Sequence, residues 1–277
     1  MNDERIAVIV LNYKSWKETL EEIDCCNRVL NADYCDIFVV DNASPNNSLE
    51  ELEIASKLKH FNLLSSNENK GYAAGNNIGL RQALLRGYKY GLILNNDIII
   101  DDPEMLEKMV SVLKIDNSVA VINPDIYAPD GHMFNRDSTR PSFWDLTFGM
   151  FRYPIKGRLI DDLGGYGYVY RPQGCCMMVD IEKLSEVDYM DENTFLYCEE
   201  PILAERLLKK GYRCACCNCT KVIHNHSTTV KNVFSKNRII KMKNVSYKYY
   251  LKKYRRFNSM QIALCLFFNV IKMQLLS

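Results

Sequence analysis

Two motifs that often bind nucleotide phosphates are missing from this sequence of 277 residues. It has no GxGxxG segment, the glycine fingerprint of dinucleotide-binding units, and no phosphate loop ending in Gly-Lys-Ser/Thr. Low-complexity segments and internal repeats are also absent. The sequence therefore predicts neither a dinucleotide-dependent enzyme nor a P-loop nucleotidase.

Hydrophobic runs long enough for a leader or a membrane span are lacking too. Residues 1–5 are polar, and the apolar run 6–11 is too short for a secretory signal. The apolar segment 262–276 is interrupted by polar residues and is too short to cross a bilayer. We therefore expect a cytoplasmic protein whose eleven cysteines are reduced thiols, not a disulfide framework.

Acidic residues are absent from the last quarter of the chain. No Asp or Glu follows Glu205, whereas 16 of the 35 Lys and Arg do. The tail 236–277 is basic and aromatic at first and then apolar, so it fits peripheral contact with the inner face of a membrane. A solvated basic helix, or a helix packed on a partner subunit in a homo-oligomer, remains an alternative.

The first 125 residues alternate between apolar runs and segments of helical periodicity, and 47% of the whole chain is hydrophobic. This order indicates an α/β fold with a Rossmann-like, mostly parallel mixed sheet flanked by helices, followed by a basic and apolar helical tail. The expected strands are 6–11, 36–40, 61–64, 90–94 and 119–122.

Polar side chains follow two of the expected strands. Asn95, Asn96 and Asp97 come directly after the run 90–94, and Asp41 follows the run 36–40. Ligands bind at the carboxyl ends of parallel strands, so Asp41 and Asp97 are expected on one edge of the sheet. A carboxylate among apolar residues is costly to bury unpaired, which favours a metal ion or ligand beside Asp97. A strand-end Asp that caps a turn is the alternative.

Three glycines spaced four residues apart, Gly71, Gly75 and Gly79, form a bare stripe if this segment is a helix. Such a stripe lets either a ligand or a neighbouring backbone come close. The sequence leaves open whether it lines a ligand site or packs tightly on the sheet.

Two adjacent carboxylates, Glu199 and Glu200, stand at the start of an expected amphipathic helix. Helix N-termini favour anions, so the pair could simply stabilise the helix. Alternatively, one Glu faces a pocket as a general base and the other anchors the loop.

Four cysteines and two histidines lie between residues 214 and 226. The CxCCxC spacing differs from the paired CxxC pattern of structural zinc sites, which disfavours such a site. His224 and His226 follow an apolar strand and offer imidazole to a divalent ion.

Taken together, these motifs resemble the family 2 inverting glycosyltransferases, particularly the bacterial rhamnosyltransferase-like branch that builds surface polysaccharides. The resemblance covers roughly residues 5 to 228 in the order of the family. It rests on VLNY at 10–13, VDNAS at 40–44, NKGYAAGNN at 69–77, LNND at 94–97, the pair at 199–200, and His224.

The resemblance implies a role for each matching position. Asp41 would contact the base of a nucleotide, and Asn12 and the segment from Gly71 to Asn77 would line its pocket. Asn95 would lie near the ribose, with Asn96 beside it. Asp97 would ligate Mg²⁺ or Mn²⁺, with His224 as a further ligand or diphosphate contact. Glu200 would be the catalytic base, with Glu199 as the alternative.

The resemblance also implies a GT-A catalytic domain at 1–230, with a nucleotide-binding half at 1–125, an acceptor half at 126–230 and a helical extension at 231–277. The implied donor is a nucleotide-sugar, dTDP-rhamnose or a UDP-sugar. The implied acceptor is a saccharide or lipid-linked saccharide, and no nucleic acid is involved.

Two departures from the family pattern leave other functions open. The metal-binding triplet is Asn-Asn-Asp and keeps one carboxylate, and the base motif is Glu-Glu where Glu-Asp is usual. A nucleotidyltransferase and a non-catalytic nucleotide-sugar-binding protein therefore remain alternatives, as does a zinc-binding interaction module.

Overall fold

The computed structural model describes residues 5–30, 33–133, 135–151, 158–225 and 235–275. Within these residues one nine-stranded mixed sheet runs in the order β3-β2-β1-β4-β8-β6-β9-β5, with β7 paired to β9. The strands are β1 (Ile6–Asn12), β2 (Cys35–Asp41), β3 (Asn62–Ser65), β4 (Tyr90–Leu94), β5 (Ile98–Ile100), β6 (Val119–Tyr127), β7 (Tyr166–Val169), β8 (Cys176–Asp180) and β9 (Arg213–His224).

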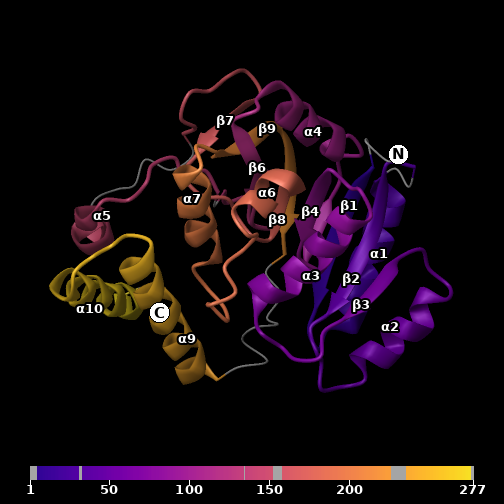
Figure 1. Cartoon of the computed structure of the whole chain (residues 1–277), viewed down its shortest axis with the longest axis horizontal. Helices are drawn as coiled ribbons and strands as arrows, with labels where there is room; N and C mark the ends of the chain where they lie inside the picture. The colour runs from indigo at the N-terminus through magenta and orange to yellow at the C-terminus, as the bar shows by residue number, and fades with distance from the viewer. Residues whose placement is uncertain (1–4, 31–32, 134, 152–157, 226–234, 276–277) are drawn as a thin grey trace.

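The first half of the sheet is parallel, as the alternating pattern predicts. β1 pairs with β2 and β4, and β2 pairs with β3, all in parallel. The connections are α1 (Trp16–Val29), α2 (Ser48–Ser56) and α3 (Tyr72–Leu85), which cover the sheet in Figure 1. Alternate residues of β1 enter separate cores: Ile6, Val8 and Val10 on one face, Ala7 and Ile9 on the other. Burial on both faces explains why the run is continuously apolar.

The second half of the sheet is mixed. β8 lies between β4 and β6 and is antiparallel to both, so the fifth expected strand is not a direct neighbour of the parallel four. The helices here are α4 (Met105–Ile115), α6 (Ile181–Glu186) and α7 (Glu199–Lys209). Because β8 runs against β4, the residues that precede β8 lie at the edge where β4 ends. The antiparallel direction of β8 thus brings these residues to the site described below.

Two glycines of the stripe in α3 serve packing. A Cβ on Gly75 would lie 2.4 Å from Leu11 Cδ1, and a Cβ on Gly79 would lie 2.5 Å from Ile9 Cγ2. The packing interpretation is therefore confirmed for these two positions. Gly71 differs: its φ is +103°, and a Cβ there would meet the backbone of Phe195 in a distant loop.

The basic tail forms the helices α9 (Lys236–Lys253) and α10 (Ser259–Leu275), which lie beside α7 and α5 (Phe143–Thr147) in Figure 1. A small core of its own joins these helices, made by Ile202, Tyr250, Leu251, Ile262 and Cys265. Among the described residues no helix combines the length and apolar character needed to cross a bilayer. The predicted boundary at residue 230 lies in 226–234, outside the described residues.

Candidate active site

The carboxylate of Asp97 and the imidazole of His224 meet at the end of the sheet. Asp97 lies between β4 and the short strand β5, and β5 pairs with the end of β9 so that Ile98 is opposite His224. His224 Nε2 lies 3.2 Å from Asp97 Oδ1, and both side chains are largely buried. A carboxylate oxygen and an imidazole nitrogen side by side are a donor set that suits a divalent cation.

A second acidic group lies close to this pair. Glu22 of α1 is buried, and its Oε2 accepts a hydrogen bond of 3.1 Å from the backbone N–H of Ile98. Burial raises the pKa of Glu22 to about 8; the hydrogen bond from Ile98 opposes this shift and the charge of Asp97 adds to it. Glu22 is therefore mostly protonated at neutral pH, and Asp97 supplies the negative charge of this buried edge.

The raised pKa of Glu22 predicts a stability change with pH. Folding keeps a proton on Glu22 that the unfolded chain releases above pH 4.5, so stability should fall as pH rises from about 5 to about 8. One such group contributes a slope of at most about 1.4 kcal/mol per pH unit. In Glu22→Gln this contribution disappears, which urea unfolding in EDTA at several pH values would measure. Glu18→Gln, an exposed change on the same helix, serves as control, and parallel curves for both variants and wild type would contradict the prediction.

A chain of hydrogen bonds joins the ends of β4, β1 and β2. Asn96 donates to Thr19 Oγ1 at 2.9 Å, and Thr19 donates to Asn12 Oδ1 at 2.8 Å. Asn12 in turn donates to Asp41 Oδ2 at 2.7 Å, and Asp41 also accepts from the N–H and hydroxyl of Ser44. Asn12 and Asp41 are both buried. These hydrogen bonds fix the orientation of the Asn12 and Asp41 side chains at this edge of the sheet.

Glu200 lies near the same edge, beside the residues that precede β8. Gly174 N–H points to Glu200 Oε1 at 3.4 Å, and the carbonyl of Cys175 accepts a 2.8 Å hydrogen bond from the N–H of Asn95. Burial raises the pKa of the Cys175 thiol, and the charges of Asp97 and Glu200 both add to this shift. The contacts of Gly174 with Glu200 and of Cys175 with Asn95 thus place Glu200 and the turn that carries Asp97 at the same edge of the sheet.

Glu199 and Glu200 differ in their surroundings although they are adjacent. Glu199 is buried, and burial followed by the charge of Glu200 raises its pKa to about 8. At neutral pH Glu199 is therefore mostly protonated and cannot accept a proton. Glu200 is less buried and sits near Arg171: desolvation lowers the pKa of Arg171, but the carboxylates of Asp137 and Glu200 outweigh it and raise that pKa overall.

The backbone just before these glutamates is strained. Tyr197 and Cys198 have φ values of +75° and +67°, a left-handed conformation that costs energy in residues with a side chain. Such a conformation persists only where the surroundings hold it. Here the loop 189–198 is held by hydrogen bonds from two helices that are far apart in the sequence, α3 and α9.

On one side, α3 holds the loop. Tyr72 N–H donates to the carbonyl of Phe195 at 3.0 Å, and a Cβ on Gly71 would lie 2.0 Å from that oxygen. Asn77 is buried, exchanges hydrogen bonds with the backbone of Met190 and donates to Glu192 at 2.8 Å. Gly71 and Asn77, predicted to line a nucleotide pocket, therefore also position the loop before Glu199.

On the other side, α9 holds the loop. The hydroxyl of Ser246 donates to the carbonyl of Leu196 at 2.8 Å. Asp191 is buried and accepts from the hydroxyls of Tyr249, at 2.8 Å, and Tyr254, while Lys253 Nζ lies 3.2 Å away. Three partners from α9 and its C-terminal end thus converge on a single carboxylate.

Several residues of this site were not predicted from the sequence. Gly174 accepts at its carbonyl a 2.7 Å hydrogen bond from Tyr72, a member of the predicted segment, and Arg171 bonds Asp137 at 2.5 Å near Glu200. Arg171 and Gly174 precede β8, so their place at the site follows from the antiparallel direction of that strand. The sequence does show a polar segment before the apolar run of β8, but such a pattern does not reveal the direction of the strand in the sheet.

The cysteine cluster does not form a metal site in the described part of the chain. Cys214, Cys216 and Cys217 are buried in β9 and Cys219 is exposed. No group of three or more metal-ligating side chains is found among the described residues. All eleven cysteines are described and none forms a disulfide, as expected. His226 lies outside the described residues.

Comparisons with known proteins identify the family and the fold. Residues 7–184 match the model of the family described as Glycosyl transferase family 2. The chain is 25% identical over 225 residues to the low-salt glycan biosynthesis hexosyltransferase Agl10 of Haloferax volcanii, covering 79% of this chain and 67% of that protein.

Solved structures share the fold. The mannosyltransferase PcManGT of Pyrobaculum calidifontis, in complex with GDP-Man and Mn²⁺, superposes with a TM-score of 0.63 at 14% identity, over 96% of this chain and 70% of that chain. GalNAc-T7 with UDP, GalNAc and Mn²⁺ superposes with a TM-score of 0.64 at 14% identity. That match covers 81% of this chain and 44% of the longer one. The predicted GT-A fold is thereby confirmed, and by the extent of its match to the family model this chain belongs to glycosyl transferase family 2.

Proposed function

We propose that this glycosyltransferase moves a hexosyl group from a nucleoside diphosphate sugar to a saccharide or lipid-linked saccharide, with inversion at the anomeric carbon. The observation that carries the proposal is the pairing of Asp97 with His224 at 3.2 Å, beside Glu200. A sugar diphosphate with an acceptor hydroxyl on its far face needs a cation site and a carboxylate base, and this edge of the sheet offers both.

Asp97 and His224 are the residues that would hold Mn²⁺ or Mg²⁺. The carboxylate and the imidazole are both largely buried, and this pair of donors fits a divalent cation. When bound, the ion supplies positive charge that stabilises the departing nucleoside diphosphate. The structures of GalNAc-T7 and PcManGT both contain Mn²⁺, which supports manganese as the first ion to test.

Glu200 is the proposed base. Its carboxylate takes the proton from the acceptor hydroxyl, the hydroxyl oxygen forms a bond to the anomeric carbon, and the bond from that carbon to the diphosphate breaks. Arg171 places a positive charge near this carboxylate, and the negative charge of Glu200 in turn helps to raise the pKa of Arg171. A single displacement of this kind inverts the configuration.

The nucleotide roles of Asn12, Asp41, Asn95 and Asn96 stay predictions from the family resemblance. The donor also stays open, because the structural neighbours bind UDP in one case and GDP-Man in the other. We propose dTDP-rhamnose or a UDP-sugar, and include GDP-mannose as a competing donor.

A panel of nucleotide sugars tests the function. With Mn²⁺ or Mg²⁺ present, we expect one of dTDP-rhamnose, UDP-glucose, UDP-N-acetylglucosamine and GDP-mannose to release free nucleoside diphosphate well above the others. Release should stop when EDTA removes the metal. Binding of a donor without any release under these conditions would instead identify a non-catalytic nucleotide-sugar-binding protein.

A further inference from the structure

An exposed apolar surface lies at the end of the molecule formed by α5 and α10. We call it the α5–α10 face and define it by its exposed side chains: Trp144, Phe148, Met260, Leu264, Phe267 and Val270. Trp144 is 61% exposed and Phe267 60% exposed. Large apolar patches on a protein surface mark interaction sites.

The two halves of this face come from distant parts of the sequence and support one another. Phe148 stacks on Trp144, with 5.8 Å between the ring centroids. Phe148 also meets Phe268 of α10 edge-on, with 4.7 Å between the centroids. Ring-to-ring packing between α5 and α10 therefore fixes the positions of these exposed aromatic side chains.

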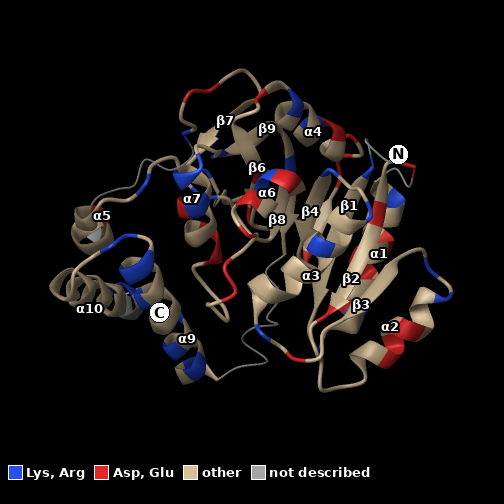
Figure 2. Ribbon diagram, viewed as in Figure 1, with Lys and Arg blue, Asp and Glu red and all other residues tan. Residues whose placement is uncertain are grey.

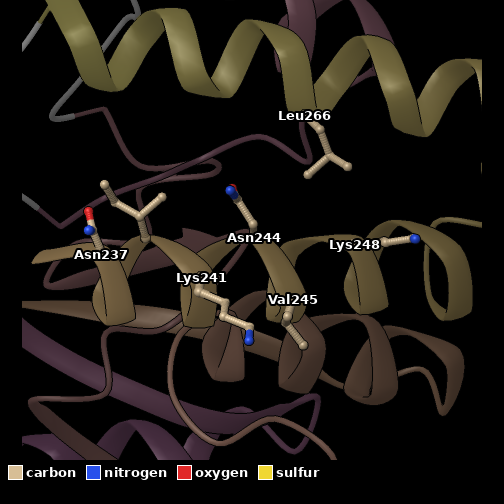
Figure 3. Close-up of a pocket in the computed structure, with 7 residues that line it drawn as sticks. Asn237, Lys241, Asn244, Val245, Lys248 and Leu266 are labelled. Atoms are coloured by element: carbon tan, nitrogen blue, oxygen red, sulfur yellow. The ribbon is translucent and has the colours of Figure 1, made fainter. Parts of the chain in front are cut away.

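Positive charge borders the face. A groove of about 520 Å³ between α9 and α10 is lined by Lys241 and Lys248 together with Asn237, Ile240, Asn244, Val245 and Leu266. In Figure 3, Leu266 reaches from α10 toward α9, and the labelled side chains come from both helices. None of the proposed catalytic side chains lines this groove.

Neither α9 nor α10 carries an acidic residue, and Figure 2 shows the blue of Lys and Arg along α9 while α10 is mostly tan. α5 contributes one acid, Asp145, whose carboxylate accepts from the N–H and hydroxyl of Ser142 at the helix start. An apolar face beside a purely cationic helix matches the interface of a bilayer that contains anionic lipids.

We propose that the α5–α10 face inserts into the interfacial layer of an anionic lipid bilayer, with Lys241 and Lys248 beside the headgroup phosphates. A second copy of this chain is a poorer fit, because a two-fold interface places the same patch on both sides. The cationic helices would then face each other across the contact. The sequence suggests membrane contact by the tail 236–277 as one of several alternatives, and this proposal adds α5 to that surface.

Vesicle sedimentation of the full chain tests the proposal. We expect binding to vesicles of phosphatidylglycerol and phosphatidylcholine, weaker binding to phosphatidylcholine alone, and release at high salt. Trp144→Ser combined with Phe267→Ser should weaken binding about tenfold or more, since two large apolar side chains no longer enter the bilayer. Lys241→Gln combined with Lys248→Gln should weaken it only for the anionic vesicles.

Matched controls lie elsewhere on the chain. Leu58→Ser with Leu85→Ser removes two leucines that are 84% and 82% exposed, and Lys209→Gln with Lys210→Gln removes two exposed charges at the end of α7. Both should bind vesicles as wild type does. If the aromatic variant does not fold, as judged by thermal unfolding, the lysine variant decides the question alone.

Three outcomes would overturn the proposal: no binding to anionic vesicles, equal loss in the control variants, or a dimer by light scattering that the aromatic variant converts to monomer. Each leaves the proposed function testable by itself, because release of nucleoside diphosphate from a water-soluble donor needs no vesicle.

Discussion

Glu200→Gln is expected to abolish sugar transfer while nucleotide binding survives. The amide cannot accept the proton of the acceptor hydroxyl, so the rate of transfer should fall by a factor of about a hundred to ten thousand. Release of nucleoside diphosphate from the preferred donor measures the rate, and calorimetric titration with the nucleoside diphosphate and Mn²⁺ measures binding. The glutamine keeps the size of the side chain and an oxygen that can accept from Gly174 N–H.

Glu199→Gln is the matched control. Since burial raises the pKa of Glu199 to about 8, its carboxyl is mostly neutral at pH 7, and an amide replaces it with little change of charge. We therefore expect a much smaller loss of rate than in Glu200→Gln. Normal turnover in Glu200→Gln, or a larger loss in Glu199→Gln, would remove Glu200 from the role of base.

Asp97→Asn is expected to remove the metal dependence of nucleotide binding. The amide keeps the shape of the side chain but loses the negative charge that attracts the cation. Affinity for the nucleoside diphosphate in Mn²⁺ should fall by about tenfold or more, while affinity in EDTA stays at the wild-type level. His224→Ala should act in the same direction, since its imidazole lies 3.2 Å from the same carboxylate.

Asp101→Asn provides the comparison for this experiment. Asp101 is exposed and lies four residues along the chain, so its loss changes the net charge equally without touching the pair. Unchanged metal dependence in Asp97→Asn, or an equal effect in Asp101→Asn, would show that the pair does not hold the ion.

The parallel half of the fold could be predicted because its signal is local. The apolar runs that form β1, β2 and β4 are buried on both faces, which a continuous apolar sequence reports directly. The polar residues that follow β2 and β4 also marked the correct edge of the sheet. Strand order in the second half could not be predicted, because β8 inserts between β4 and β6 through pairings that depend on tertiary packing.

The convergence of the site depends on those long-range pairings. His224 reaches Asp97 because β5 pairs with the end of β9, more than a hundred residues later. The hydrophobic pattern of the sequence does not predict the contact between His224 and Asp97; only the family resemblance suggests it. Likewise, the regular spacing of the glycines does not show that they have different roles. Gly75 packs on Leu11 of β1, whereas Gly71 contacts Phe195 in a distant loop.

Because α9 stabilises the loop 189–198 and follows it in the sequence, the loop cannot reach its final conformation until α9 has been synthesised. Asp191 finds its hydroxyl and ammonium partners 58 to 63 residues further along the chain. While the ribosome is still making that last stretch, the left-handed turn at Tyr197 and Cys198 lacks half of its support. We therefore expect the loop before Glu199 and Glu200, with the proposed base, to be the last part of the candidate site to reach its final position, after the parallel half of the sheet has formed.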